Sequence, residues 1–296
     1  HLTSGSDGKT LSKDGEYALK RLIKGLASSR LSARQGFATC LTEMLESVKG
    51  VNISEAFEML SAGTKVTGSV RGAEERDLLF GRLFGFIAFT RSGVLSDSKE
   101  HKNRVLEGLL ELHKKKDWIR EVTTEAMLDL LELYSTKDFI QEVLPLVEGF
   151  FPDTIDGMSP TQLMWCVGME QYAKRDDTAA AAITPLLPSK KKTVSAKNVV
   201  ALVPTLMVAC SGFPKMHRSW EYVLGSIFSL DARSLPTVRS EPLSEKKESM
   251  LLPFSKFLDS NLLGAAGSHE KRSVAMRLVV EMVLRVPAEF IPSVVS

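Results

Sequence analysis

The residues that could perform chemistry are few and scattered along this 296-residue chain. The stretch Gly5-Ser6-Asp7-Gly8-Lys9-Thr10 ends like a phosphate-binding loop, but Thr3 stands where that motif needs its first glycine. The histidines form no HExxH pattern and are not spaced with the cysteines as metal ligands are. The neighbouring Asp176 and Asp177 are interpreted as solvated charge. We therefore expect no nucleotide site, no metal site, no cofactor and no catalytic residue.

Basic residues are the stronger candidates for a functional site. A first group lies across the first two expected helices and consists of Lys20, Lys24, Arg30 and Arg34. Lys20 and Lys24 are one helical turn apart and share a face. Three interpretations are open for this group: a contact with nucleic-acid phosphates, a contact with an acidic protein partner, or a solvated face. Arg30 or Arg34 is also a candidate for bonding helix-end carbonyls within the turn.

A second basic group is the run Lys114, Lys115 and Lys116, at the end of another expected helix. Cations at this position also interact favourably with the helix dipole. A stabilising role at the helix end and a contact with phosphate or an acidic partner are both open for this run.

The elements that position these residues are expected to be helices. Leu19, Leu22, Ile23 and Leu26 lie at i, i+3, i+4 and i+7, the spacing of one helix face, and the pattern continues along the chain. Capping boxes are expected at Ser32 with Gln35, Asn52 with Glu55, and Ser159 with Gln162. Further helices are expected at residues 33–48, 53–63, 73–91, 98–115, 117–134, 137–149, 159–173, 195–211, 216–229, 245–262 and 269–285. The expected loops are residues 64–72, 150–158, 174–194 and 230–244.

No alternating strand pattern of useful length is present, so the expected fold class is all-α. One helix with its loop takes roughly 25 residues, so a pair takes about 50, close to the HEAT and armadillo period. We expect a flexible tail over residues 1–12, followed over residues 13–296 by an α-solenoid of HEAT/armadillo-like antiparallel helix pairs. A compact bundle is the alternative. Gly81 and Gly85 should allow another helix to approach closely.

Composition limits the function classes. Hydrophobic residues make up 44% and charged residues 25%, which excludes disorder for most of the chain. The longest apolar run, residues 199–210, is too short to span a membrane and contains Pro204. The net charge of +2 is too small to indicate nucleic-acid binding by the chain as a whole. The three cysteines are far apart in the sequence, which favours a reducing compartment. The chain has no initial methionine, so we expect it to be part of a longer protein.

Three segments are more specific than composition. Residues 21–45 contain RLIKGL, then SRLSARQGF, then LTEML. Residues 76–93 read RDLLFGRLFGFIAFTRSG, and residues 213–220 read FPKMHRSW, in which Lys215 replaces an arginine. These segments resemble the DNA polymerase phi family, which is also called Myb-binding protein 1A-like.

The resemblance implies a large protein of the nucleus and nucleolus, built from HEAT- or armadillo-like helices. It also implies a role in ribosomal RNA gene expression and large-subunit assembly, with preribosomal proteins and rRNA or rDNA chromatin as partners. The chain has no Tyr-x-Asp-Thr-Asp motif, whose carboxylates would hold two magnesium ions, so no polymerase activity is expected. The expected function is a non-catalytic scaffold without membrane or small-molecule ligands. The alternative is a solenoid adaptor in transport or trafficking with protein partners only.

Overall fold

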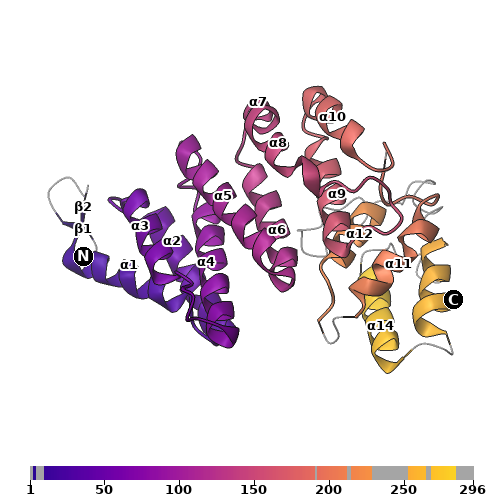
Figure 1. The fold of residues 1–296 in the computed structure, drawn as a ribbon, viewed down its shortest axis with the longest axis horizontal. Helices are drawn as coiled ribbons and strands as arrows, with labels where there is room; N and C mark the ends of the chain where they lie inside the picture. Colours follow the sequence, from indigo (N-terminus) through magenta and orange to yellow (C-terminus); the bar gives the residue numbers. More distant parts are fainter. Residues whose placement is uncertain are drawn as a thin grey trace. The chain divides into compact units, whose positions relative to one another are not determined.

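The computed structural model describes residues 3–4, 10–190, 192–211, 215–228, 253–264 and 268–284. Helices dominate these residues, and the chain divides into two compact units, His1–Tyr134 and Ser135–Ser296 (Figure 1). The strands in the described residues are β1 (Thr3–Ser4) and β2 (Thr10–Leu11), which pair antiparallel within the expected tail. The all-α fold class is confirmed, whereas the solenoid arrangement stays a prediction.

Unit 1 is a set of packed helices. Leu19, Leu41, Leu79 and Leu109 are each at most 2% exposed and belong to its core. The most extensive contacts join α2 to α4, α5 to α6 and α1 to α2. Its elements are α1 (Lys13–Gly25), α2 (Leu31–Ser47), α3 (Ile53–Gly63), α4 (Gly72–Arg91), α5 (Lys99–Lys115), the 3-10 turn η1 (Asp117–Ile119) and α6 (Arg120–Leu131).

Side-chain caps explain where several of these helices begin. Asn52 accepts a hydrogen bond from the backbone N–H of Glu55 at 3.2 Å, and its own amide group donates to the Glu55 carboxylate at 2.9 Å. The cap at Asn52 is therefore confirmed, but Glu55 bonds the Asn52 side chain and not the backbone N–H that a capping box would use. The prediction of a cap at Ser32 was wrong, because α2 already begins at Leu31 and its N-cap residue, Arg30, makes no side-chain capping bond.

The glycine-bearing face of α4 packs closely, as expected. A Cβ atom on Gly85 would lie 2.5 Å from the methyl carbons of Leu60 in α3. A Cβ atom on Gly81 would lie 3.1 Å from the backbone of Ala27, directly after α1. Glycine at these two positions thus lets both neighbours approach the α4 backbone.

Unit 2 is also helical. Its core includes Trp165, Trp220, Tyr222 and Phe254, none of which is more than 2% exposed. Residues 253–258 are helical as well. The other elements are α7 (Thr136–Asp138), the π-turn η2 (Phe139–Val143), α8 (Leu144–Val147), the 3-10 turn η3 (Glu148–Phe150), α9 (Pro160–Tyr172), α10 (Asp177–Ile183), the 3-10 turn η4 (Thr184–Leu186), α11 (Val199–Ala209), α12 (Ser219–Phe228), the π-turn η5 (Asp259–Leu263) and α14 (His269–Val283).

Helix starts in unit 2 show one confirmed prediction and one error. The capping box of Ser159 and Gln162 is formed in both directions, at 3.2 and 2.9 Å. The expected loop at residues 174–194 is wrong in part, because it contains α10. Asp176 caps that helix by accepting from the N–H of Ala179 at 2.8 Å, so it is a capping residue as well as a solvated charge.

The expected loop at 230–244 and part of the expected helix at 245–262 lie outside the described residues. Among the described helices, none combines the length and apolar character needed to cross a membrane.

Candidate functional site

The structure separates Arg34 from the other members of the first basic group. Its side chain is only 5% exposed and forms an ion pair with Asp77 of α4 at 3.2 Å. The guanidinium donates to the carbonyl oxygen of Ser28 through Nε at 3.2 Å and Nη2 at 2.9 Å. Burial lowers the pKa of Arg34, and Asp77 opposes this by favouring the charged form.

The assignment of Arg34 to a partner-binding surface was therefore wrong. Its Nε and Nη2 donors are already used within the protein, on a backbone carbonyl and a carboxylate. The alternative expectation is confirmed in part, because Arg34 bonds a carbonyl of this turn, but that carbonyl belongs to Ser28, beyond the end of α1. Its guanidinium also lies 4.9 Å from the centre of the Phe80 ring, which fixes its position further.

The other three members of the first group are exposed. Lys20 and Lys24 lie on the solvent side of α1, opposite its buried residues Leu19 and Ile23. Arg30 is exposed directly before α2. None of these three cations has an ion-pair partner among the described residues, so their charges remain available for a contact.

The lysine run at the end of α5 also contains both paired and unpaired cations. Lys116 forms an ion pair with Glu75 of α4 at 3.2 Å, and Lys115 lies 4.0 Å from Glu111. Lys114 is exposed and has no ion-pair partner in the described part of the chain. Lys114 and Lys115 also occupy the last turn of α5, where their charges interact favourably with the helix dipole. This stabilising role is compatible with a contact to a partner.

Helix α4 brings the two basic groups together. Asp77 binds Arg34 of α2, and Glu75, two residues earlier, binds Lys116 after α5. The turn between α1 and α2 and the end of α5 consequently flank the beginning of the same helix. Glu75 and Asp77 are two residues apart and point to different sides of α4. The two basic groups, about 80 residues apart in sequence, thus both adjoin the beginning of this helix.

Two further exposed arginines lie at the beginning of α4, and the sequence analysis did not identify them. Arg71 precedes the first residue of α4, and Arg76 lies one turn before Phe80. A cation at a helix N-terminus opposes the helix dipole, and this was the available signal for Arg71. We call these exposed cations the basic surface of unit 1, and they are Lys20, Lys24, Arg30, Arg71, Arg76, Lys114 and Lys115.

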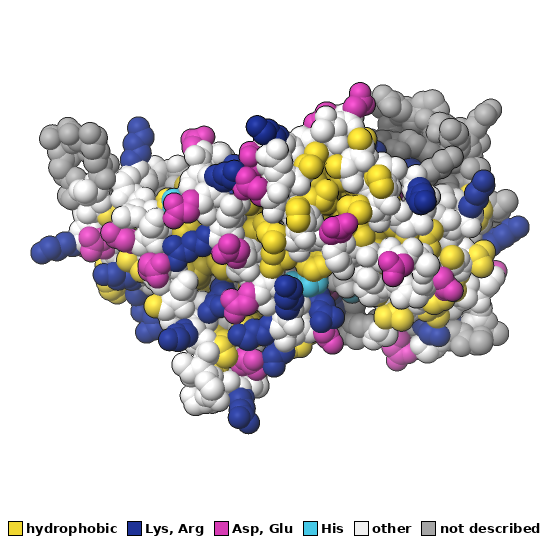
Figure 2. All heavy atoms as spheres, turned by 45° about the horizontal axis from the view of Figure 1, so that its top comes forward, with side chains coloured by type: hydrophobic (Ala, Val, Ile, Leu, Met, Phe, Trp, Pro, Cys, Tyr) yellow, Lys and Arg dark blue, Asp and Glu magenta, His cyan; other side chains and the backbone are white. Residues whose placement is uncertain are grey.

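In the space-filling view, lysine and arginine side chains gather along the lower part of unit 1, with fewer acidic side chains between them (Figure 2). The positive charge also acts on His113 in α5. Burial, followed by the neighbouring charges of Arg120 and Lys114, lowers the pKa of His113 to about 4. This histidine is therefore neutral at physiological pH, and it adds no charge to the surface.

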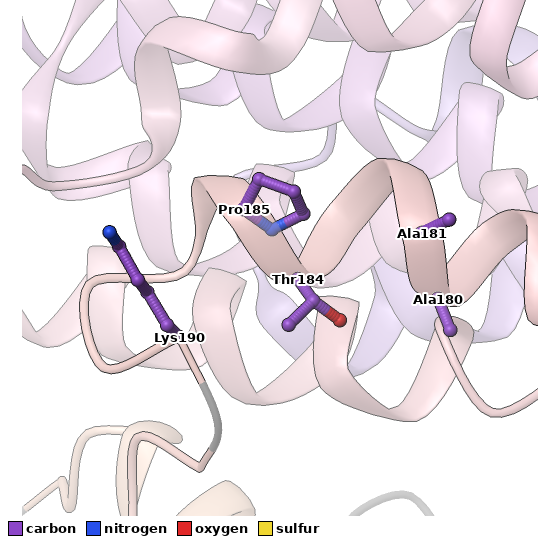
Figure 3. Close-up of a pocket in the computed structure, with 5 residues that line it drawn as sticks. All are labelled: Ala180, Ala181, Thr184, Pro185 and Lys190. Carbon is purple, nitrogen blue, oxygen red and sulfur yellow. The ribbon is translucent and has the colours of Figure 1, made fainter.

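A hollow lies in unit 2, beside α10 (Figure 3). It encloses about 570 Å³ and is lined by Ala180, Ala181, Thr184, Pro185 and Lys190. Methyl and ring carbons form most of its wall, and the Lys190 ammonium points away from the two alanines. One hydroxyl and one ammonium group provide no acid–base pair, so we assign no chemistry to this hollow.

Unit 2 also contains a buried carboxylate. Glu170 of α9 accepts a hydrogen bond from the backbone N–H of Thr193 at 2.6 Å. Burial raises the pKa of Glu170, against the opposing effects of this hydrogen bond and of Lys192 and Lys174. The contact holds the stretch after Lys190 on α9, which is a structural role. Among the described residues, no three His, Cys, Asp or Glu side chains are placed to hold a metal ion.

Comparison with known proteins shows similarity to regulators of ribosomal RNA genes. The chain is 40% identical over 110 residues to the rDNA transcriptional regulator pol5 of Schizosaccharomyces pombe, which covers 36% of this chain and 12% of that protein. It is 34% identical over 136 residues to the rDNA transcriptional regulator POL5 of Saccharomyces cerevisiae, covering 37% and 13%. Mouse Myb-binding protein 1A is 26% identical over 215 residues, covering 71% of this chain and 15% of that protein.

The aligned regions thus span 15% or less of the length of these relatives. No solved structure matches the chain significantly. The family model described as DNA polymerase phi matches residues 17–296, which include both basic groups and all the described helices except the first four residues of α1. A match over nearly the whole sequence establishes that the chain belongs to the DNA polymerase phi family.

Proposed function

We propose that this chain is part of a non-catalytic nucleolar scaffold in ribosome biogenesis, which acts in rRNA gene transcription and in pre-rRNA and large-subunit assembly. The observation that carries the proposal is the identity of 40% and 34% to two proteins that are both named rDNA transcriptional regulators. The relatives are named as regulators or as a Myb-binding protein, which supports a binding role over catalysis.

The basic surface of unit 1 gives this role a physical basis. Its exposed cations without ion-pair partners in the described residues attract polyanions, and rRNA and rDNA are the polyanions of the compartment proposed. We infer that Lys20, Lys24 and Arg30 contact such a partner, together with Lys114 at the end of α5. The partners in this scheme are preribosomal proteins and rRNA or rDNA chromatin.

Crosslinking in the cells that produce the protein tests this function. The tagged protein is crosslinked, purified under denaturing conditions, and the recovered RNA, DNA and proteins are identified. The proposal predicts enrichment of pre-rRNA or rDNA sequences together with large-subunit assembly proteins. Recovery of protein partners from transport or trafficking, without enrichment of rRNA or rDNA, would establish the adaptor alternative instead.

A further inference from the structure

Trp118 is an exposed aromatic residue on the basic surface of unit 1. Its exposure is 44%, whereas Trp165 and Trp220, the other two tryptophans of the chain, are 1% and 0% exposed. It lies in the turn η1, directly after the lysine run. A large part of the indole ring is thus left in water, which makes it a candidate for contact with a ligand.

The ring of Trp118 is supported from within the protein. Its centre lies 5.2 Å from the centre of the Phe80 ring, at an interplanar angle of 40°. Phe80 in turn lies beside the guanidinium of the buried Arg34, at 4.9 Å. A supported aromatic ring loses little conformational freedom when a ligand stacks on it, which favours binding.

Cations precede the two rings of this pair in sequence. Lys114 and Lys115 lie four and three residues before Trp118, at the end of α5, and Arg76 lies one turn before Phe80 on α4. Arg76 and Lys114 have no ion-pair partner among the described residues.

Two of the nearby carboxylates are already paired. Glu75 binds Lys116 at 3.2 Å, and Asp117 binds Arg120 at 2.8 Å. These acidic groups therefore cancel little of the charge on the free cations around Trp118.

We propose that Trp118 is a stacking platform for an unpaired base of single-stranded RNA, whose phosphates are bound by Arg76 and Lys114. Aromatic stacking combined with nearby cations is how proteins hold single-stranded nucleic acid without reading its sequence. A duplex hides the faces of its bases, whereas a single strand exposes both the base to stack on the indole and the phosphates to bind the cations. The choice of RNA rests on the proposed function, because pre-rRNA is the single-stranded polyanion of that role.

Intrinsic fluorescence tests the proposal directly on the 296-residue chain. Trp118 is the accessible member of the three tryptophans, so a base that stacks on it should quench the emission saturably. The probe is an unstructured RNA of about 12 nucleotides, within the usual site sizes for single strands. An RNA duplex of the same length and a polyglutamate peptide serve as comparison ligands, and neither should produce this quenching.

Two variants at one position separate stacking from charge. With a labelled RNA, Trp118→Ala should weaken binding by about 5- to 150-fold, the range measured for the loss of one stacked base. Trp118→Phe keeps an aromatic ring and should retain most of the affinity. Unchanged affinity in Trp118→Ala, with circular dichroism showing a folded chain, would overturn the proposal, as would equal quenching by the duplex or the peptide.

The same variants distinguish failure of this site from failure of the proposed function. If Trp118→Ala leaves RNA affinity unchanged while cellular crosslinking still recovers rRNA, the stacking site is wrong and the nucleolar function stands. If RNA binding depends on Trp118 but crosslinking recovers neither rRNA nor rDNA, the site stands and the nucleolar function is wrong.

Discussion

Replacement of Arg34 by methionine should lower the stability of the protein, whereas the same replacement of Arg30 should leave it almost unchanged. Arg34→Met keeps most of the apolar stem but removes the hydrogen bonds to Ser28 and the ion pair with Asp77. Hydrogen bonds from a charged group contribute about 1.5–3 kcal/mol, and a cation over an aromatic ring about 0.5–2 kcal/mol. Burial of the methionine offsets part of this loss, so we expect Arg34→Met to cost about 2–4 kcal/mol.

The matched control is Arg30→Met, which removes the same charge four residues earlier. Arg30 is exposed, and substitutions at exposed sites usually change the stability by no more than about 0.5 kcal/mol. The assay is urea unfolding of each variant, followed by circular dichroism and by hydrogen exchange in α1 and α2. Equal unfolding midpoints for the two variants would refute the structural role assigned to Arg34.

A double variant tests the mechanism of this loss. Asp77 is only 14% exposed, so Arg34→Met leaves a largely buried carboxylate without its partner. Adding Asp77→Asn removes that charge. The double variant should therefore lose less stability than the sum of the two single variants, whereas simple additivity would show that the pair is not coupled.

Three further predictions concern packing and pH. Gly85→Leu should lower the free energy of unfolding by about 1–3 kcal/mol because Leu60 occupies the space, and an unchanged unfolding midpoint would show that this face of α4 is open. As the pH falls below 6.5, the unfolded chain binds a proton at His113 before the folded chain does, so stability should fall toward pH 4. His113→Asn should flatten this decline in melting temperature, and identical slopes would contradict the assignment. Because the pKa of Glu170 is raised in the folded state, the unfolded state loses this proton first as the pH rises, and the stability falls. Glu170→Gln removes this charge and should be at least as stable as the wild type at pH 7. A melting temperature as low as that of Glu170→Ala would contradict this.

Helix positions were predictable where local signals determine them. The helix expected at residues 53–63 forms with those bounds, because a polar cap and a 3.6-residue apolar period both act within a few residues. Helix α10 was missed because its alanines have high helix propensity but show no alternation between an apolar and a polar face.

The candidate site was predictable only in part, because it depends on contacts between distant residues. Exposure of Lys20 and Lys24 follows from the apolar stripe on the other side of α1. Burial of Arg34 depends on Asp77, which lies 43 residues further along the chain. The aromatic support of Trp118 likewise comes from Phe80 on another helix, which the sequence around Trp118 does not show.

The central claim is that the basic surface of unit 1 connects the chain to rRNA or rDNA, and charge reversal measures this most directly. Lys20→Glu with Lys24→Glu is compared with Lys49→Glu with Lys137→Glu, which makes the same change in net charge at exposed lysines elsewhere. The measurement is the amount of rRNA and rDNA crosslinked to each variant in cells, with melting temperatures taken in parallel. We predict a marked loss for the first pair, wild-type recovery for the second, and unchanged melting temperatures for both. Wild-type recovery by the Lys20 and Lys24 variant would contradict the claim and leave these residues as a solvated face.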